Sequence, residues 1–196
     1  MLPTRRAVLA GFLAVPALSA ALPALAAGKA AAERAATPAC HDGDAPTIAQ
    51  TEGPYFSPGA PLKRDFSADS PRGERITLAG LVLTTACRPV PRALIELWHA
   101  DERGDYDNAG FRLRGHQFAD DEGRWWFDTI IPGLYTGRTR HYHLKVQRRG
   151  GRVLTTQLYF PGEAGNASDG IFDERLLLEI RRTADGKFGR FDFVVG

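Results

Sequence analysis

Two histidines separated by one residue give the chain its first candidate chemistry. His141 and His143 lie in the segment 140–147 (RHYHLKVQ), in which apolar residues alternate with polar ones. This alternation predicts a β-strand, in which residues i and i+2 point to the same face, about 7 Å apart. Both imidazoles could therefore bind one metal ion; the alternative is a pair of surface or hydrogen-bonded histidines.

Two tyrosines in turn-rich segments supply candidate oxygen ligands. Tyr135 lies in the turn 131–138 (IPGLYTGR), just before His141, and Tyr106 lies in the polar loop 101–110 (DERGDYDNAG). Tyrosine, with an ordinary pKa of about 10, loses its proton and binds a metal only beside a strongly charged cation. Two phenolates together with two imidazoles suit ferric iron better than zinc in ligand hardness and charge.

Short alternating segments, separated by turns rich in Gly and Pro, predict the elements that would position these residues. We expect strands over 75–83, 94–99, 125–131, 140–147 and 153–160, and a C-terminal hairpin turning at Asp185-Gly186. If Arg149-Gly150-Gly151 forms a hairpin loop, His143 lies opposite Gln157, but a slip of one residue would turn Gln157 to the other face. With scarcely any helical periodicity, the pattern predicts an all-β protein, an antiparallel β-sandwich.

The first 26 residues differ in composition from the rest. Arg5 and Arg6 precede an Ala-rich run that ends in Ala24-Leu25-Ala26, a small-x-small cleavage pattern. The run predicts a signal peptide over 1–26, and TRRAVLAGF resembles a twin-arginine export signal. We expect an exported protein with no stable membrane association after signal removal; a retained N-terminal anchor is the alternative.

The remaining chain is close to neutral in charge. Once the two arginines of the leader are set aside, 23 basic residues face 23 acidic ones, which gives no electrostatic case for nucleic acid as a partner. Residues 27–50 predict a linker and a loosely held arm before a β-sandwich domain over 51–196. In an oxidising compartment Cys40 and Cys87 would either form a disulfide or remain free thiols.

Four segments of the chain together resemble one enzyme family. They are TEGPYF (51–56), CRPVPRALIELWHADERGDYD (87–107), FRLRGHQFADDEGRWWFDTIIPGLYTGRTRHYHLKV (111–146) and LTTQLYFPGE (154–163). The order WHAD-x-x-G-x-Y, PG-x-Y, GR-x-x-H-x-H and TTQ resembles that of the intradiol ring-cleavage dioxygenases, and most of all their short exported members. Catechol and protocatechuate dioxygenases usually have a longer insertion between the second tyrosine and the histidines. The interval in this chain is short, so the shape of the substrate pocket stays open. The chain also shows no counterpart of the N-terminal helical segment of catechol dioxygenases, so the resemblance does not give the mode of any homo-oligomer.

The resemblance implies a catalytic β-sandwich with one non-haem Fe(III), whose ligands would be Tyr106, Tyr135, His141 and His143. It also implies that Arg138 stabilises negative charge on ring and oxygen, and that Gln157 orients Arg138 or the oxygen by hydrogen bonding. The implied partners are a small catechol-type substrate and O2, and the implied product is a cis,cis-muconate-type diacid. In that reaction the Tyr135 phenolate leaves the metal and takes up a proton.

Two other functions use the same residues differently. A zinc-dependent hydrolase would combine the histidine pair with an acid such as Asp105 or Asp107, whereas a non-catalytic exported binding module would need no metal. We expect His99 and Trp98 to be packed and hydrogen-bonded, and Tyr142, on the apolar face of its strand, to lie in the core. Tyr55 would either lean over the mouth of the pocket or pack within its own loop.

Overall fold

The computed structural model describes residues 45–196, and the predicted signal peptide lies outside the described residues. The strands of this part of the chain are β1 (Arg75–Thr84), β2 (Leu94–Trp98), β3 (Arg114–Phe118), β4 (Arg124–Ile130), β5 (His141–Gln147), β6 (Leu154–Tyr159), β7 (Glu179–Thr183), β8 (Gly186–Arg190) and β9 (Phe193–Val195). Two short 3₁₀ helices, η1 (Ala164–Ala167) and η2 (Glu174–Leu176), lie between β6 and β7. Within this range no helix has the length and hydrophobicity that crossing a membrane requires.

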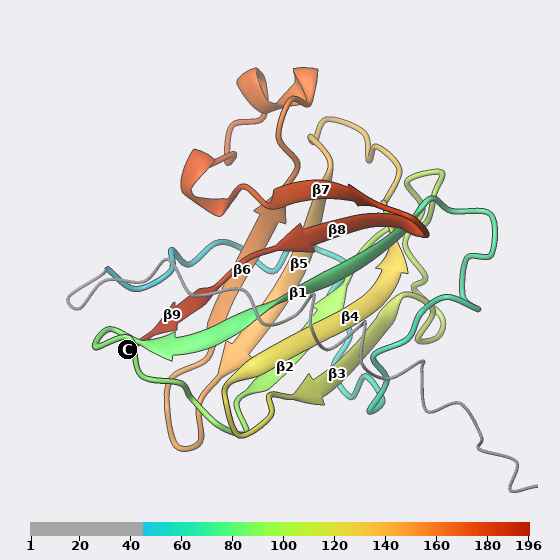
Figure 1. Cartoon of the computed structure of the whole chain (residues 1–196). Coiled ribbons are helices and arrows are strands. Elements are labelled where there is room, and N and C mark those ends of the chain that lie inside the picture. The colour runs from blue at the N-terminus through green and yellow to red at the C-terminus, as the bar shows by residue number, and fades with distance from the viewer. Residues whose placement is uncertain (1–44) are drawn as a thin grey trace, which may run out of the picture. The chain divides into compact units, whose positions relative to one another are not determined.

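The strands form two sheets that pack face to face (Figure 1). One has the order β4-β1-β8-β7, with β9 paired to β1, and the other has the order β3-β2-β5-β6. Fully buried side chains from both sheets form one apolar core, among them Leu78, Phe127, Leu97 and Leu144. The prediction of an all-β sandwich is therefore confirmed.

The five predicted strands are present with ends shifted by one residue at most, and β7 and β8 form the predicted hairpin. The prediction that the sandwich is antiparallel was wrong in one respect, since β1 pairs in parallel with both β8 and β9. The chain reaches β7 by a long connection from β6, in the other sheet. No hairpin turn therefore fixes the direction of β8 against β1, and alternation in the sequence carries no information about it.

Strand β3 was not predicted, because polar residues occupy its buried positions. Arg114 and Gln117 are buried there, and Gln117 is hydrogen-bonded to the backbone of Trp126. Such a strand lacks the apolar alternation on which recognition from sequence depends. It nevertheless completes the sheet that carries the histidines, by pairing with β2.

Residues 47–56, here called the N-terminal strap, run along the outer edge of β6 and then over the face of the β3-β2-β5-β6 sheet that points away from the core. Their first part was expected in a loose arm, but the backbone N–H of Thr47 donates to Val194 O and that of Gln50 donates to Thr155 O. These are backbone contacts and leave no periodic signal in the sequence. Beyond the sheets, Cys87 is disulfide-bonded; Cys40 lies outside the described residues.

Candidate metal centre

The two histidines project from β5 on the face that the strap covers. Their Nε2 atoms lie 3.1 Å apart, while the intervening Tyr142 points into the core and donates to the carbonyl of Ile130. His141 Nδ1 lies 2.6 Å from the carbonyl oxygen of Thr139, so Nδ1 carries the proton and the lone pair is at Nε2. Two ligand atoms bound at about 2.1 Å and near right angles to one ion also lie about 3 Å apart.

Burial keeps both imidazoles in the neutral form that binds metals. His141 and His143 are 4% and 3% exposed. Burial lowers the pKa of His141 to about 4 and that of His143 well below its ordinary value, and the Arg138 charge acts in the same direction. His143 Nδ1 is buried without a hydrogen-bond partner in the described part of the chain, and Trp98 stacks on its ring at 5.1 Å. At 3.1 Å, either a proton or a cation must separate the two nitrogen lone pairs.

Tyr106 approaches the histidines from the loop between β2 and β3. Its hydroxyl lies 3.4 Å from His141 Nε2. Gly104, two residues earlier, has φ +94, and a Cβ there would lie 2.2 Å from Leu134 O. Only glycine permits this crossing, which brings the loop of Tyr106 against the loop of Tyr135.

The phenol of Tyr106 needs a cation if it is to act as a ligand. Burial raises its pKa, and the charges of Arg138 and Arg114 only partly oppose that effect. A metal ion would be the strong nearby charge that favours the phenolate. The neutral imidazoles, their spacing and this phenol therefore fit a bound metal.

Tyr135 joins the same cluster through Tyr55 of the strap. The hydroxyls of Tyr55 and Tyr135 lie 2.9 Å apart, and the Tyr55 ring stacks on Tyr106 at 4.5 Å. The Tyr135 ring is edge-on to Tyr106 at 5.9 Å. The sequence left the place of Tyr55 open, and the structure puts it against both candidate ligands. Gly53 (φ +70) allows this approach, since a Cβ there would lie 3.2 Å from His143 Cε1.

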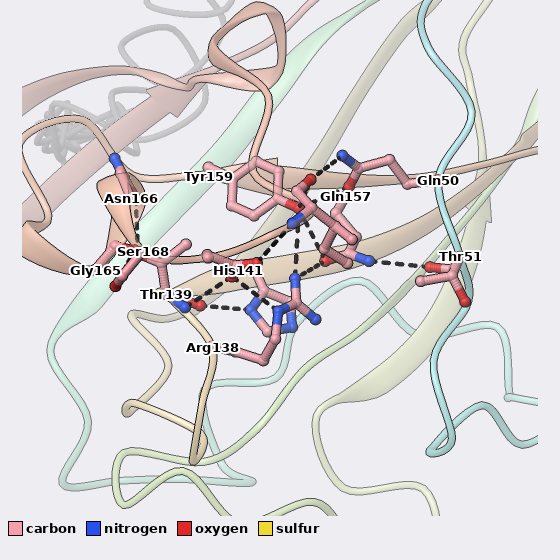
Figure 2. A network of polar contacts seen from close by, with 12 residues as sticks. Gln50, Thr51, Arg138, Thr139, His141, Gln157, Tyr159, Gly165, Asn166 and Ser168 are labelled. Carbon is pink, nitrogen blue, oxygen red and sulfur yellow. Dashed lines mark hydrogen bonds and ion pairs between the residues drawn. The ribbon is translucent and has the colours of Figure 1, made fainter.

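Arg138 and Gln157 are brought together beside His141 (Figure 2). Gln157 lies opposite His143 in the β5–β6 register, as predicted. Its Oε1 accepts a hydrogen bond of 2.7 Å from Arg138 Nη2, and its Nε2 donates to the carbonyl of Thr51 at 3.0 Å. The hydroxyl of Tyr159 also donates to Gln157 Oε1, at 3.2 Å.

Two residues of this cluster, Arg114 and Tyr159, were not identified from the sequence. Arg114, 1% exposed, donates to the carbonyls of Asp107 and Tyr55 and so joins the Tyr106 loop to the strap. Tyr159 could have been found, because it lies two residues after Gln157 and shares its face. Arg114 stands in a segment without strand periodicity and left no comparable signal.

The carboxylates that a zinc site would need are not gathered here. In residues 45–196 no three His, Cys, Asp or Glu side chains group so that they could hold a metal. The side chain of Asp105 is 76% exposed, and the Asp107 carboxylate accepts from three backbone N–H groups of its own loop. The oxygen donors beside the histidines are tyrosines.

Fold and site together define a β-sandwich protein with a candidate mononuclear centre of histidine and tyrosine ligands. A family model described as "Dioxygenase" matches residues 51–195. The chain is 29% identical over 154 residues to a chlorocatechol 1,2-dioxygenase of Rhodococcus opacus, covering 63% of this chain and 60% of that protein. It is 35% identical over 135 residues to the protocatechuate 3,4-dioxygenase beta chain of Burkholderia cepacia, covering 57% of each.

A solved structure is similar over most of the domain. It is the dioxygenase domain of a dioxygenase carbohydrate-binding protein fusion from Streptomyces sp. SirexAA-E, with 48% identity and a TM-score of 0.75. The match covers 77% of this chain and 98% of that one. The chain belongs to the intradiol ring-cleavage dioxygenase family. It spans 60% and 57% of the lengths of the two curated relatives named above.

Proposed function

We propose that the chain is an Fe(III)-dependent intradiol dioxygenase that cleaves a catechol-type ring with O2. Cleavage between the two hydroxyl-bearing carbons, with both oxygen atoms incorporated, gives a cis,cis-muconate-type diacid. The observation that carries the proposal is the convergence of Tyr106, His141 and His143, with Nε2 atoms 3.1 Å apart and the phenol 3.4 Å from His141. Relatives named for chlorocatechol and protocatechuate support the substrate class.

The proposed ligands are Tyr106, Tyr135, His141 and His143. Two hard phenolate oxygens and two neutral imidazoles match ferric iron in hardness and charge. When bound, Fe(III) would draw electron density from a chelated catechol and make its ring reactive toward O2. The protein contributes a buried cluster in which the pKa values of both imidazoles are lowered. Both histidines therefore stay neutral and keep a nitrogen lone pair for the metal.

Tyr135 is the proposed acceptor of a substrate proton at its phenolate oxygen. It lies on a loop and not on a strand, and its hydroxyl is 2.9 Å from that of Tyr55. The Tyr55 hydroxyl would hold the protonated, unligated Tyr135 by a hydrogen bond. Tyr106, stacked beneath Tyr55 and close to His141, would stay in place.

Arg138 is the proposed stabiliser of negative charge on ring and oxygen. Its guanidinium is a permanent cation, 19% exposed at its side chain, beside Gln157 on the histidine face of the sheet. A fixed cation in a site with little water stabilises developing charge more strongly than one in solvent.

The visible spectrum of the purified protein tests the proposal. Phenolate-to-Fe(III) charge transfer would make the protein red, and adding catechol would shift the band before the ring is cleaved. Tyr106→Phe or His141→Ala should abolish ferric binding or turnover, because each removes a ligand. Tyr142→Phe, on the same strand but facing the core, is the matched control and should keep colour and turnover.

A fully active Tyr106→Phe variant would refute the ligand assignment. A colourless protein loaded with stoichiometric zinc would favour the hydrolase, and one that retains no metal would favour a binding module.

We also propose that the enzyme acts outside the cytoplasm, on the export pattern of residues 1–26. The disulfide at Cys87 is consistent with an oxidising compartment. Replacing Arg5 and Arg6 by lysine should retain the protein in the cytoplasm, as measured by fractionation. Unchanged export of that variant would contradict the twin-arginine route.

A further inference from the structure

The loop between β6 and η2 carries a buried aspartate that no motif singled out. The side chain of Asp169 is 1% exposed. Its Oδ2 accepts hydrogen bonds from Arg138 Nε at 2.8 Å and from the backbone N–H of Thr139 at 2.9 Å. Its Oδ1 accepts from the backbone N–H of Ile171 at 3.1 Å. The carboxylate is thus fixed by two backbone groups and presents one oxygen to the arginine.

Arg138 is held at two points of its planar fork. Nε donates to Asp169. Nη2 donates to Gln157 Oε1 at 2.7 Å and to Tyr159 OH at 3.4 Å (Figure 2). Nη1 donates to none of the residues in the described range. Because the guanidinium is rigid and planar, contacts at both ends set its plane as well as its position. Gln157 alone would leave the fork free to rotate.

We propose that Asp169 is a positioning residue that fixes the direction in which Arg138 presents Nη1 to the substrate. The inference rests on the proposed function for the role of Arg138. The clamp, as we call the contacts of Asp169 and Gln157 with Arg138, is itself a property of the folded chain. A carboxylate this deeply buried would be costly without its cation, so the two side chains are expected to depend on each other.

Asp169 reaches a candidate metal ligand by a second route. It accepts from the backbone N–H of Thr139, whose carbonyl oxygen accepts from His141 Nδ1. If Asp169 acted mainly through His141, replacing it would change iron content and the visible band of the resting protein. If it acts through Arg138, iron content and the visible band stay as in the wild type while turnover falls.

Asp169→Asn tests the proposal in the purified iron-containing enzyme. We expect kcat to fall roughly ten- to a hundredfold and KM to change less than about threefold, because a misplaced catalytic group loses orientation more than binding. Asp192→Asn is the matched control. The Asp192 carboxylate, between β8 and β9, also accepts from a backbone N–H (Leu81) and from an arginine side chain (Arg190). It should lower kcat less than about twofold.

A double-mutant cycle with Arg138→Gln separates positioning from general stabilisation. On the Arg138→Gln background, Asp169→Asn should lower kcat further by less than about twofold. The urea midpoint of the double variant should likewise fall by less than the sum of the losses in the two single variants. Additive losses in both measurements would overturn the proposal.

Two further outcomes are decisive. Asp169→Glu keeps the charge but moves it by one methylene, so wild-type kcat in that variant would contradict a positional role even if Asp169→Asn does not fold. If the wild type cleaves no catechol, the proposed function fails. The urea midpoints then still test the clamp. Non-additive losses in the two variants support it, and additive losses refute it.

Discussion

Lowering the pH from about 7.5 to about 5 should destabilise the protein through His99, the buried histidine that follows β2. His99 is 1% exposed, and its Nδ1 lies 2.7 Å from the carbonyl oxygen of Ala100, so Nδ1 carries the proton. Nε2 then accepts from Thr129 Oγ1 at 2.7 Å, across the sandwich on β4. A second proton would break that hydrogen bond and place a charge in the core, and burial accordingly lowers the pKa of His99 to about 4.

The size of the effect follows from this lowered pKa. The ordinary value is 6.5, so on acidification the unfolded chain binds the proton before the folded one does. The stabilisation is complete above about pH 6.5 and is lost as the pH falls toward about 4. Between about pH 7.5 and about pH 5, the free energy of unfolding should fall by about 2 kcal/mol from this group.

Urea unfolding of the wild type and His99→Gln at the two pH values measures this contribution. The difference in free energy of unfolding between them should shift by about 2 kcal/mol in favour of the variant at the lower pH. Tyr142→Phe, a buried neighbour whose ring is 5.0 Å from His99, should keep a constant difference from the wild type. A His99→Gln difference that is equally constant would refute the reasoning.

Two further predictions concern the loops that carry the tyrosines. Tyr55→Phe keeps the stack on Tyr106 but removes the hydroxyl 2.9 Å from Tyr135, and steady-state kinetics should show a loss of kcat of roughly three- to tenfold; unchanged kcat would contradict the role given to this hydrogen bond. In Arg114→Gln the shorter side chain cannot donate to the carbonyls of both Tyr55 and Asp107. Urea unfolding should show a free energy of unfolding lower by about 2–4 kcal/mol, and an iron assay should show a lower iron content. Wild-type stability in that variant would show that these contacts do not hold the loops.

β5, which carries the histidines, and β6, which carries Gln157, were predictable because their core-facing residues are apolar apart from Thr156. In β5 and β6 the residues facing the core alternate strictly with those facing away, and a Gly-Gly turn sets the register. This is why the pairing of His143 with Gln157 could be inferred from the sequence and is found in the structure. The approach of Tyr106 to His141 was reached only through the resemblance to a family, since loop geometry has no period.

What could not be predicted depends on buried polar groups and backbone contacts. β3 carries arginine and glutamine at buried positions, the strap is attached by hydrogen bonds of its main chain and of its side chains, and Asp169 lies in a loop without a motif. In each case a polar group is satisfied by a partner far away in the sequence, such as Tyr55 for Arg114. Short-range pattern cannot specify such partners, although a buried polar group requires one.

The arrangement divides the proposed ligands into two mechanical classes. His141 and His143 stand on β5, a central strand paired on both sides, so their positions are set by the sheet. Tyr106 and Tyr135 stand on loops that are held against the sheet by crossings at glycine and by Tyr55 of the strap. A ligand that must leave and return during turnover is better placed on a loop than on a strand, because its movement breaks no ladder hydrogen bonds. Tyr135, which stands on a loop and whose hydroxyl lies 2.9 Å from that of Tyr55, meets that requirement, whereas the imidazoles are fixed by the sheet.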